Sequence, residues 1–469
     1  MADPRPNILF IMADDHAAHA MSCYGSKVNT TPHLDRIAEG GMRFDNCFCT
    51  NSICTPSRAV ILTGTYSHVN GVTTLASCLD NRLMTFPKLL QAAGYQTGIV
   101  GKWHLGHGPE HDPRGFDYWK ILHVHGRYHD PVLLDENGKE EFEGYLTDIT
   151  VDLSLDWLKQ RDPERPFCLL CHHKAPHRPW DPDEKHRKMF ENREIPAPPT
   201  FDDDYANRAT AAREAKMRIL DDLDERDLKG PVPEGLTSEE TKWWKYQRYM
   251  QDYLACCASI DDNTGRLLDY LDEAGLAENT IVIYTSDQGF FLGDHGWFDK
   301  RFMYEESLRM PFIIRWPREI APGTVNSDMM LNVDFASYFL DCAGVEIPEE
   351  FQGRSFRPLT HGATPDDWRD AMYYRYWMHR GGGHNVFAHY GVRTKRYKLI
   401  YYYADGMGQP GVSDETNPPE WELFDLEHDP YELCSVYDDP DYAETVAELK
   451  DVLHRLQAEV GDERHSTDK

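Results

Sequence analysis

The run Asn7-Ile8-Leu9-Phe10-Ile11-Met12, which leads into Asp14-Asp15, sets the architecture expected of this 469-residue chain. A short, continuous apolar run between polar residues predicts a strand buried on both faces. Runs of the same kind occur at 97–100, 167–171, 280–284 and 311–314. The chain therefore contains several candidate strands for the interior of one sheet.

Helical segments separate these apolar runs. Thr31-Pro32 has the cap-then-proline chemistry of a helix start, and Gly40-Gly41 ends that helix. Residues 85–93 repeat this design, and apolar residues recur at helical spacing between 253 and 271. Strands that alternate with helices predict an α/β fold, in which a large, mostly parallel (mixed) sheet is sandwiched by helices.

Polar side chains stand directly after the predicted strands. Ligands bind at the carboxyl ends of the strands in such sheets, so we expect these side chains to meet at one rim. Asp14 and Asp15 follow the first predicted strand, and Lys102 and His104 follow the strand at 97–100. His172 to His177 follow the strand at 167–171, and Asp287 follows the strand at 280–284.

The carboxylates of Asp14, Asp15 and Asp287 would repel one another at that rim unless a cation joined them. Oxygen ligands suit a hard ion such as Ca²⁺, Mg²⁺ or Mn²⁺, and Gln288 adds a carbonyl oxygen. An Asp-Asp pair by itself more often forms a turn or a helix cap. The second acidic strand end favours the metal interpretation.

The run Cys54-Thr55-Pro56-Ser57-Arg58 predicts a helix N-terminus, because Pro56 suits the first turn and an apolar run follows. Such an end binds anions and would lower the pKa of a plain thiol. The alternative is an unmodified, buried cysteine in an ordinary helix. Arg58, Lys102 and Lys300 provide positive charge for an anion, and His104 and His177 suit proton transfer.

Two further regions differ in composition from the predicted sheet. Residues 191–245 are rich in charge and proline and predict an insertion of surface helices and loops that borders the substrate entrance. Strand-like alternation at 390–393, 397–402 and 421–425, followed by a helix at 442–460, predicts a C-terminal antiparallel α+β subdomain. We therefore divide the chain into a catalytic domain, 1–365, and a subdomain, 366–469.

Five segments together resemble type I sulfatases, the formylglycine-dependent, arylsulfatase-like enzymes of the alkaline phosphatase superfamily. This resemblance covers nearly the whole chain and supplements the chemistry inferred above from the residues alone. They are Asp14-Asp15, the stretch from Cys54 to Gly64, Gly101-Lys102-Trp103-His104-Leu105-Gly106, Ala175-Pro176-His177-Arg178-Pro179, and Ser286-Asp287-Gln288-Gly289 with Asp299-Lys300-Arg301.

The resemblance implies a formylglycine at residue 54, made from Cys54 by a formylglycine-generating enzyme, as the nucleophile. It also implies one divalent metal ion, Ca²⁺ before Mn²⁺ or Mg²⁺. The implied ligands are Asp14, Asp15, Cys54, Asp287 and Gln288, where Gln288 replaces the asparagine of many relatives. The implied catalytic residues are Cys54, Arg58, Lys102, His104, His177, Asp287 and Lys300.

The family chemistry assigns a role to each catalytic residue. Arg58 helps to hold the nucleophile, and Asp287 helps to deprotonate it. Lys102, Lys300 and His177 grip the sulfate, and His177 or Lys300 assists the leaving oxygen. His104 takes the proton that allows sulfate to depart. We also expect His295 near the site, whereas His172, His173, Lys174, Trp103 and His384 are weaker candidates for shaping the pocket.

The net charge of −30 makes nucleic acid an improbable partner and would repel long polysulfated chains. Eleven cysteines without a disulfide or zinc spacing, and a start without a secretory apolar stretch, lead us to expect reduced thiols and a cytoplasmic protein. No apolar run is long enough to span a membrane.

These observations favour a hydrolase of small sulfate esters, either aryl sulfates or sulfated sugars. Two alternatives stay open at this point. One is a phosphonate monoester or phosphodiester hydrolase of the same superfamily, and the other is a metal-bound protein that binds sulfate compounds without turnover. A homodimer is a further expectation.

Overall fold

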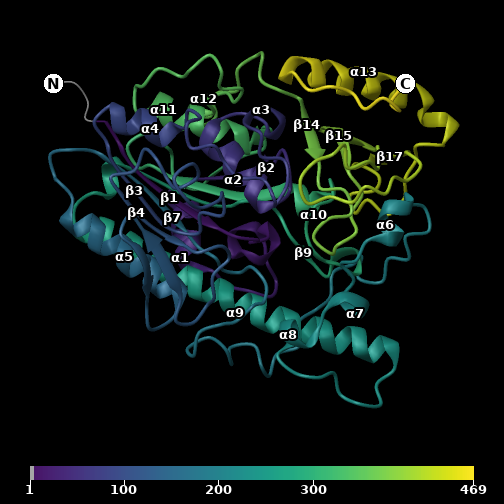
Figure 1. The fold of residues 1–469 in the computed structure, drawn as a ribbon, viewed down its shortest axis with the longest axis horizontal. Coiled ribbons are helices and arrows are strands. Elements are labelled where there is room, and N and C mark those ends of the chain that lie inside the picture. The colour runs from purple at the N-terminus through teal and green to yellow at the C-terminus, as the bar shows by residue number, and fades with distance from the viewer. Residues whose placement is uncertain (1–4) are drawn as a thin grey trace.

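The computed structural model describes residues 5–469, and an eleven-stranded sheet forms its centre (Figure 1). Strands β8 (Thr280–Ser286), β1 (Asn7–Ala13), β7 (Phe167–His172) and β3 (Gln96–Gly101) lie side by side and run parallel. Strand β11 (Arg309–Arg315) pairs antiparallel with β8. All five strands predicted from apolar runs are present, and the predicted mixed α/β sheet is confirmed.

The remaining strands extend this sheet on both sides. On the β11 side lie β2 (Met42–Phe48), β12 (Thr324–Asn326) and β13 (Met330–Leu331), and on the β3 side lie β4 (Tyr118–Leu122), β5 (Val132–Asp135) and β6 (Gly138–Glu141). A separate two-stranded sheet joins β9 (Phe291–Leu292) to β10 (Phe298–Asp299).

Strand β1 is apolar throughout because helices cover both of its faces. From Ile8 to Ala13 every residue is fully buried. Ile8, Phe10 and Met12 pack in one core with helices α2 (Cys54–Thr63), α4 (Phe86–Ala92) and α11 (Phe335–Cys342). Leu9, Ile11 and Ala13 pack in another with α1 (Pro32–Glu39), α5 (Leu146–Gln160) and α9 (Ser238–Glu273).

The insertion predicted at 191–245 is less separate than its composition suggested. Its last residues already belong to α9, which begins at Ser238 behind a capping box between Thr237 and Glu240. The helix predicted over 253–271 is therefore only the buried half of a 36-residue helix. The insertion holds the short helices α6 (Thr210–Glu214), α7 (Ile219–Asp222) and α8 (Glu225–Leu228). Other short helices elsewhere in the chain are α3 (Ser67–Asn70), α10 (Glu305–Leu308) and α12 (Arg357–Thr360).

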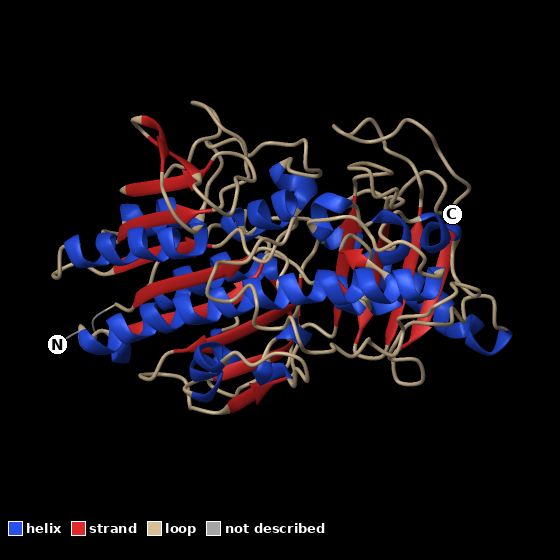
Figure 2. Ribbon diagram, turned by 90° about the horizontal axis from the view of Figure 1, so that it is seen from below, coloured by secondary structure: helices blue, strands red, loops and turns tan. Residues whose placement is uncertain are grey.

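A second group of strands forms the C-terminal sheet (Figure 2). Its antiparallel order is β14 (Ala371–Tyr376), β15 (His389–Thr394), β16 (Tyr397–Tyr402) and β17 (Glu420–Asp425), and helix α13 (Ala443–Val460) packs against it. The sequence pattern found all of these elements except β14. The division into domains at residue 365 stays a prediction.

Strand β14 ties the C-terminal sheet to the large one. The backbone N–H of Arg375 donates to the Thr50 carbonyl at 3.1 Å. The Tyr374 hydroxyl accepts a hydrogen bond from the Ser52 N–H at 3.0 Å and donates to the Arg301 carbonyl at 2.8 Å. The missed strand thus holds the segment that leads into Cys54. Within residues 5–469, no helix is both long and apolar enough to cross a bilayer.

His295 fastens the acidic insertion to the body of the protein. Its Nδ1 lies 2.8 Å from a carboxylate oxygen of Asp203, and its Nε2 lies 3.8 Å from Glu306. Burial disfavours the charged imidazole, but the hydrogen bond to Asp203 and the attraction to Glu306 outweigh it and raise the pKa of His295 to about 9. The protonated ring is therefore part of the folded structure at neutral pH.

We expect this ion pair to make stability depend on pH. A raised folded-state pKa stabilises the protein fully below the unfolded value of about 6.5, and that contribution is lost as the pH rises through about 9. Urea unfolding at pH 6.5 and pH 9 should show a loss of at most about 3 kcal/mol in the wild type that His295→Gln lacks. The surface variant His361→Gln is the control, and an unchanged loss in His295→Gln contradicts the assignment.

Candidate active site

The register of the central strands brings three aspartates together. Ala13 pairs with Ser286 across β1 and β8, so the next residues of both strands emerge side by side. The Asp287 N–H donates to the Ala13 carbonyl at 3.2 Å, and the Asp15 N–H donates to the Asp287 carboxylate at 3.3 Å. The carboxylates of Asp14, Asp15 and Asp287 are all buried. The predicted convergence at the strand ends is thus present in the structure.

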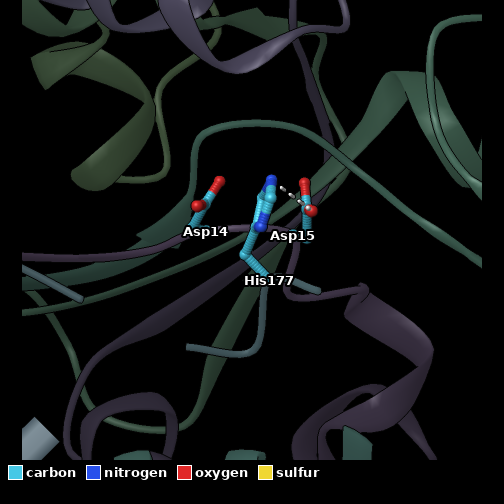
Figure 3. Close-up of side chains that lie close together, drawn as sticks. All are labelled: Asp14, Asp15 and His177. Atoms are coloured by element: carbon cyan, nitrogen blue, oxygen red, sulfur yellow. Dashed lines mark ion pairs between the residues drawn. The ribbon is translucent and has the colours of Figure 1, made fainter. Parts of the chain in front are cut away.

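His177 joins this acidic rim from the loop after β7. One oxygen from each of Asp14 and Asp15 and one ring nitrogen of His177 lie within 4.8 Å of one another (Figure 3). The His177 Nε2 lies 3.8 Å from an Asp15 oxygen. Its Nδ1 lies 2.6 Å from the Arg178 carbonyl, which only accepts, so Nδ1 carries the hydrogen. In the neutral ring the Nε2 lone pair therefore faces the two carboxylates.

Crowding of the acids shifts their pKa values apart. Burial, reinforced by the neighbouring carboxylates, raises the pKa of Asp15 to about 7 although Lys300 opposes it. Burial and Asp14 raise the pKa of Asp287 to about 6. For Asp14, burial acts in the same direction but is outweighed by Lys102, so its pKa lies well below the usual range. Further positive charge at this rim would favour the ionised form of all three.

The residues at the rim fit a divalent cation. The Asp14 Oδ1 and Gln288 Oε1 atoms are buried and have no hydrogen-bond partner within residues 5–469. The Gln288 side-chain nitrogen donates to Asp15 Oδ1 at 2.5 Å, which leaves the carbonyl oxygen of Gln288 for another ligand. Two unpartnered oxygens beside crowded carboxylates are a donor set for a hard ion. His177 lies beside these predicted oxygen ligands, whereas sequence reasoning had placed it in the grip on sulfate and in proton transfer.

Three cations neutralise the aspartates. The Lys300 Nζ lies 2.6 and 2.7 Å from the two Asp15 oxygens, and the Lys102 ammonium is hydrogen-bonded to Asp14. Arg58 donates to Asp287 at 2.9 Å and to the Lys102 carbonyl at 3.0 Å. The predicted positive residues are therefore all at the rim, each bound to an acid.

Cys54 is the first residue of α2, as its sequence context predicted, and is 1% exposed. The charges of Lys102, Lys300, Asp14 and Asp287 all act on its thiol. The expectation that the helix N-terminus lowers the pKa of a plain thiol is wrong in this setting. Burial raises the pKa of Cys54, and the two lysines only oppose it. An unmodified Cys54 would be a neutral, weak nucleophile.

A cavity of about 420 Å³ opens onto Cys54. The insertion contributes Asp224 and Arg226 to its lining, so the prediction that the insertion borders the site is confirmed. Gly382 and His384 come from the C-terminal region. The other lining residues are Leu75, His125, Gly126, Lys174, His177, Arg178, Pro179, Asp299, Lys300 and Arg301.

His104 contacts this cavity through a second histidine. Its Nδ1 lies 3.2 Å from the Thr55 hydroxyl, beside Cys54. Its ring centroid lies 4.0 Å from that of His125, which in turn lies 4.8 Å from the His177 ring. Burial and the charge of Lys102 hold the pKa of His104 well below its usual range, so the ring is neutral at neutral pH.

Sequence reasoning missed His125, Arg178 and Arg226 as lining residues. His125 lies in a loop between β4 and β5 with no strand end to mark it, and Arg226 lies in the acidic insertion. Of the weaker candidates, Lys174 and His384 line the cavity, and Trp103, His172 and His173 are buried outside the lining. His295 was expected near the site, but its side chain and backbone N–H contact the insertion and helix α10.

Comparisons with known proteins agree with this geometry. The sulfatase family profile matches residues 6–345, and a profile described as N-sulphoglucosamine sulphohydrolase, C-terminal, matches 293–459. The N-acetylglucosamine-6-O-sulfatase of Bacteroides thetaiotaomicron is 45% identical over 98% of this chain and 87% of its own length. The human N-acetylglucosamine-6-sulfatase is 29% identical over 81% of this chain and 68% of its own length.

Solved structures share the fold. One that is 43% identical superposes with a TM-score of 0.91, covers 99% of this chain and 100% of its own, and holds its substrate D-glucosamine-2-N,6-O-disulfate. The phosphonate monoester hydrolase of Silicibacter pomeroyi, 21% identical with a TM-score of 0.77 over 99% of this chain and 97% of its own, shows likeness of fold alone.

One end of the large sheet holds the acidic rim, the cysteine at a helix start and the paired lysines. The sulfatase family profile, which matches residues 6–345, covers the strands of that sheet. The chain accordingly belongs to the sulfatase family and is a sulfate ester hydrolase.

Proposed function

We propose that this enzyme removes the 6-O-sulfate from N-acetylglucosamine or a related glucosamine derivative. The observation that carries this proposal is the cavity at Cys54, whose far wall is built from hydrogen-bonding side chains. The relative that is 45% identical over 98% of this chain acts on this sugar, according to its name. A relative with a TM-score of 0.91 binds a glucosamine disulfate.

The polar wall favours a sugar over a plain aromatic leaving group. Arg301 donates to Asp299 at 3.1 Å, and the His384 Nε2 lies 3.1 Å from the other Asp299 oxygen. Burial acts against ionisation of Asp299, but these neighbours and Lys300 outweigh it and hold its pKa well below the usual range. A fixed carboxylate beside a guanidinium and an imidazole offers acceptors and donors to vicinal hydroxyls.

The nucleophile is proposed to be the formylglycine form of residue 54. The raised pKa of the thiol makes the unmodified side chain a poor candidate at neutral pH. Residue 54 lies within the field of Lys102 and Lys300, which would stabilise negative charge on the attacking oxygen and on the sulfate. Arg58 holds Asp287, whose carboxylate is placed to accept a proton from the nucleophile.

Two histidines are placed to move protons on either side of the sulfate. The free Nε2 of His177 faces the acid pair and can exchange a proton with the leaving oxygen. His104 stands beside Thr55 with a neutral ring and can take the proton whose loss releases sulfate from residue 54. Lys300 reaches the same cavity and can assist the leaving group.

We propose Ca²⁺ as the ion, held by Asp14, Asp15, Asp287, Gln288 and residue 54. When bound, a divalent ion would lower the pKa of an oxygen nucleophile and neutralise charge on sulfate. The oxygen-rich donor set supports a hard ion. The long side chain of Gln288 still reaches Asp15, so it substitutes for the shorter asparagine of many relatives.

Substrate choice tests the proposal directly. We expect N-acetylglucosamine-6-O-sulfate to be hydrolysed with a kcat/KM at least about 100-fold above that of an aryl phosphonate monoester. Sulfate release and phosphonate cleavage are measured with the same preparation, and an aryl sulfate serves as a positive control. A phosphonate preference would favour the rival hydrolase, and release from none of the esters would favour the non-catalytic binding protein.

Replacing the nucleophile should remove turnover without removing the fold. Cys54→Ala is expected to lower kcat by at least on the order of 10⁴-fold, with an unchanged circular dichroism spectrum. Cys78→Ser, at an exposed cysteine, is the matched control. Mass spectrometry of the peptide that contains residue 54 should show loss of the thiol in the active wild type. Full activity with an intact thiol would refute formylglycine as the nucleophile.

Metal removal should change both activity and stability. We expect EDTA to abolish sulfate release and Ca²⁺ to restore it, and Ca²⁺ at 100 times its Kd should stabilise the fold by about 2.7 kcal/mol. Asp14→Asn should weaken this stabilisation, whereas Asp156→Asn, at an exposed aspartate, should not. The metal assignment fails if chelation leaves both the rate and the unfolding midpoint unchanged.

A further inference from the structure

The cations that line the cavity at Cys54 differ in whether a carboxylate is bound to them. Five lysine and arginine side chains line it, and three of them are bound to acids: Lys300 to Asp15, Arg178 to Asp227 and Arg301 to Asp299. Lys174 and Arg226 form no ion pair within residues 5–469. The place of each unpaired cation in the cavity indicates which anion it serves.

Lys174 belongs to the inner end of the cavity. It is only 3% exposed, and its nitrogen lies 5.1 Å from the centre of the Tyr128 ring. The charges of Asp14, Asp15 and Lys102 all act on it, so it stands beside the acidic rim. This position assigns Lys174 to the sulfate that is cleaved.

Arg226 belongs to the outer end. It is exposed and lies in α8, the four-residue helix of the acidic insertion. The Asp224 carboxylate caps this helix by accepting the N–H groups of Arg226 and Asp227 at 2.9 and 3.1 Å. Arg178, on the cavity wall, donates to the Asp227 carboxylate at 3.1 Å. The backbone at Arg226 is therefore fixed to the cavity wall, whereas its guanidinium forms no hydrogen bond or ion pair among the described residues.

The two carboxylates that line the cavity, those of Asp224 and Asp299, have other partners, although the charge of Arg226 also acts on Asp224. Asp224 uses its carboxylate for the helix cap, and Asp299 is bound by Arg301 and His384. A guanidinium held at a cavity mouth offers paired N–H groups to a carboxylate or a sulfate. Because Arg226 forms no ion pair within residues 5–469, its guanidinium provides a local site for an anion at the mouth of the cavity.

Resting on the proposed function, we infer that Arg226 binds a second anionic group of the substrate. Two sources share this chemistry: a sulfamate on the same glucosamine, or the carboxylate of a neighbouring uronic acid. The site then selects substrates with two anions, one at Cys54 and one at the mouth of the cavity. Lys174 serves only the first.

Three substrates separate these roles. They are N-acetylglucosamine-6-O-sulfate with one anion, D-glucosamine-2-N,6-O-disulfate, and a disaccharide that joins 6-O-sulfated N-acetylglucosamine to a uronic acid. Arg226→Gln should lower kcat/KM for at least one dianionic substrate about tenfold more than for the monosulfate, and the loss should appear in KM. Arg226→Lys should recover part of it. The substrate that suffers identifies the sulfamate or the carboxylate as the partner.

Two further variants control this experiment. Lys174→Gln should lower kcat/KM for all three substrates by a similar factor. Lys188→Gln removes one positive charge from another cavity of the same region and should leave the ratios between substrates unchanged, which excludes a general effect of net charge.

The outcomes separate this inference from the proposed function. If the wild type hydrolyses none of the three sugars, the proposed function fails and the inference fails with it. If the wild type hydrolyses them and Arg226→Gln lowers all three equally, or none, the inference alone is overturned. Selective loss on a dianionic substrate supports both.

Discussion

The site depends on the alignment of β1 with β8, because that register places acids of two distant segments side by side. Ala13 and Ser286 pair, and Asp14, Asp15 and Asp287 follow directly. A shift by one residue would turn these side chains to the opposite layer of the sheet. Successive residues of β1 pack alternately into two different helical layers, and this packing opposes that shift, so the apolar core fixes the positions of the catalytic acids.

Gathering buried carboxylates is unfavourable, and the rest of the rim offsets this cost. Lys300, Lys102 and Arg58 each bind one aspartate, and two oxygens stay available for a cation. The same lysines act on residue 54. One set of charges thus stabilises the acids of the resting site and would stabilise an anion that arrives there. The lysines can therefore be bound to aspartates in the resting site and still attract a sulfate.

Much of this arrangement follows from the sequence. Five apolar runs gave the central strands, and the polar residues after them gave the rim, because strand ends of a parallel sheet meet at one edge. The pKa of Cys54 was misjudged, since a helix N-terminus is visible in sequence but burial is not. His125, Arg226 and strand β14 were missed because loop positions and edges of the second sheet carry no periodic signal.

The net charge of −30 does not describe the electrostatic field inside the cavity. It argued against extended polysulfated chains, since long-range repulsion acts before contact. Screening limits that repulsion to about 8 Å at physiological salt, so the groups that line a cavity decide what binds inside it. Here those groups include Lys174 and Arg226, which have no ion pair within the described chain, while the lining carboxylates of Asp224 and Asp299 have other partners. An acidic enzyme can therefore bind a strongly anionic sugar in this cavity, provided that the sugar is a short unit and not an extended polysulfated chain.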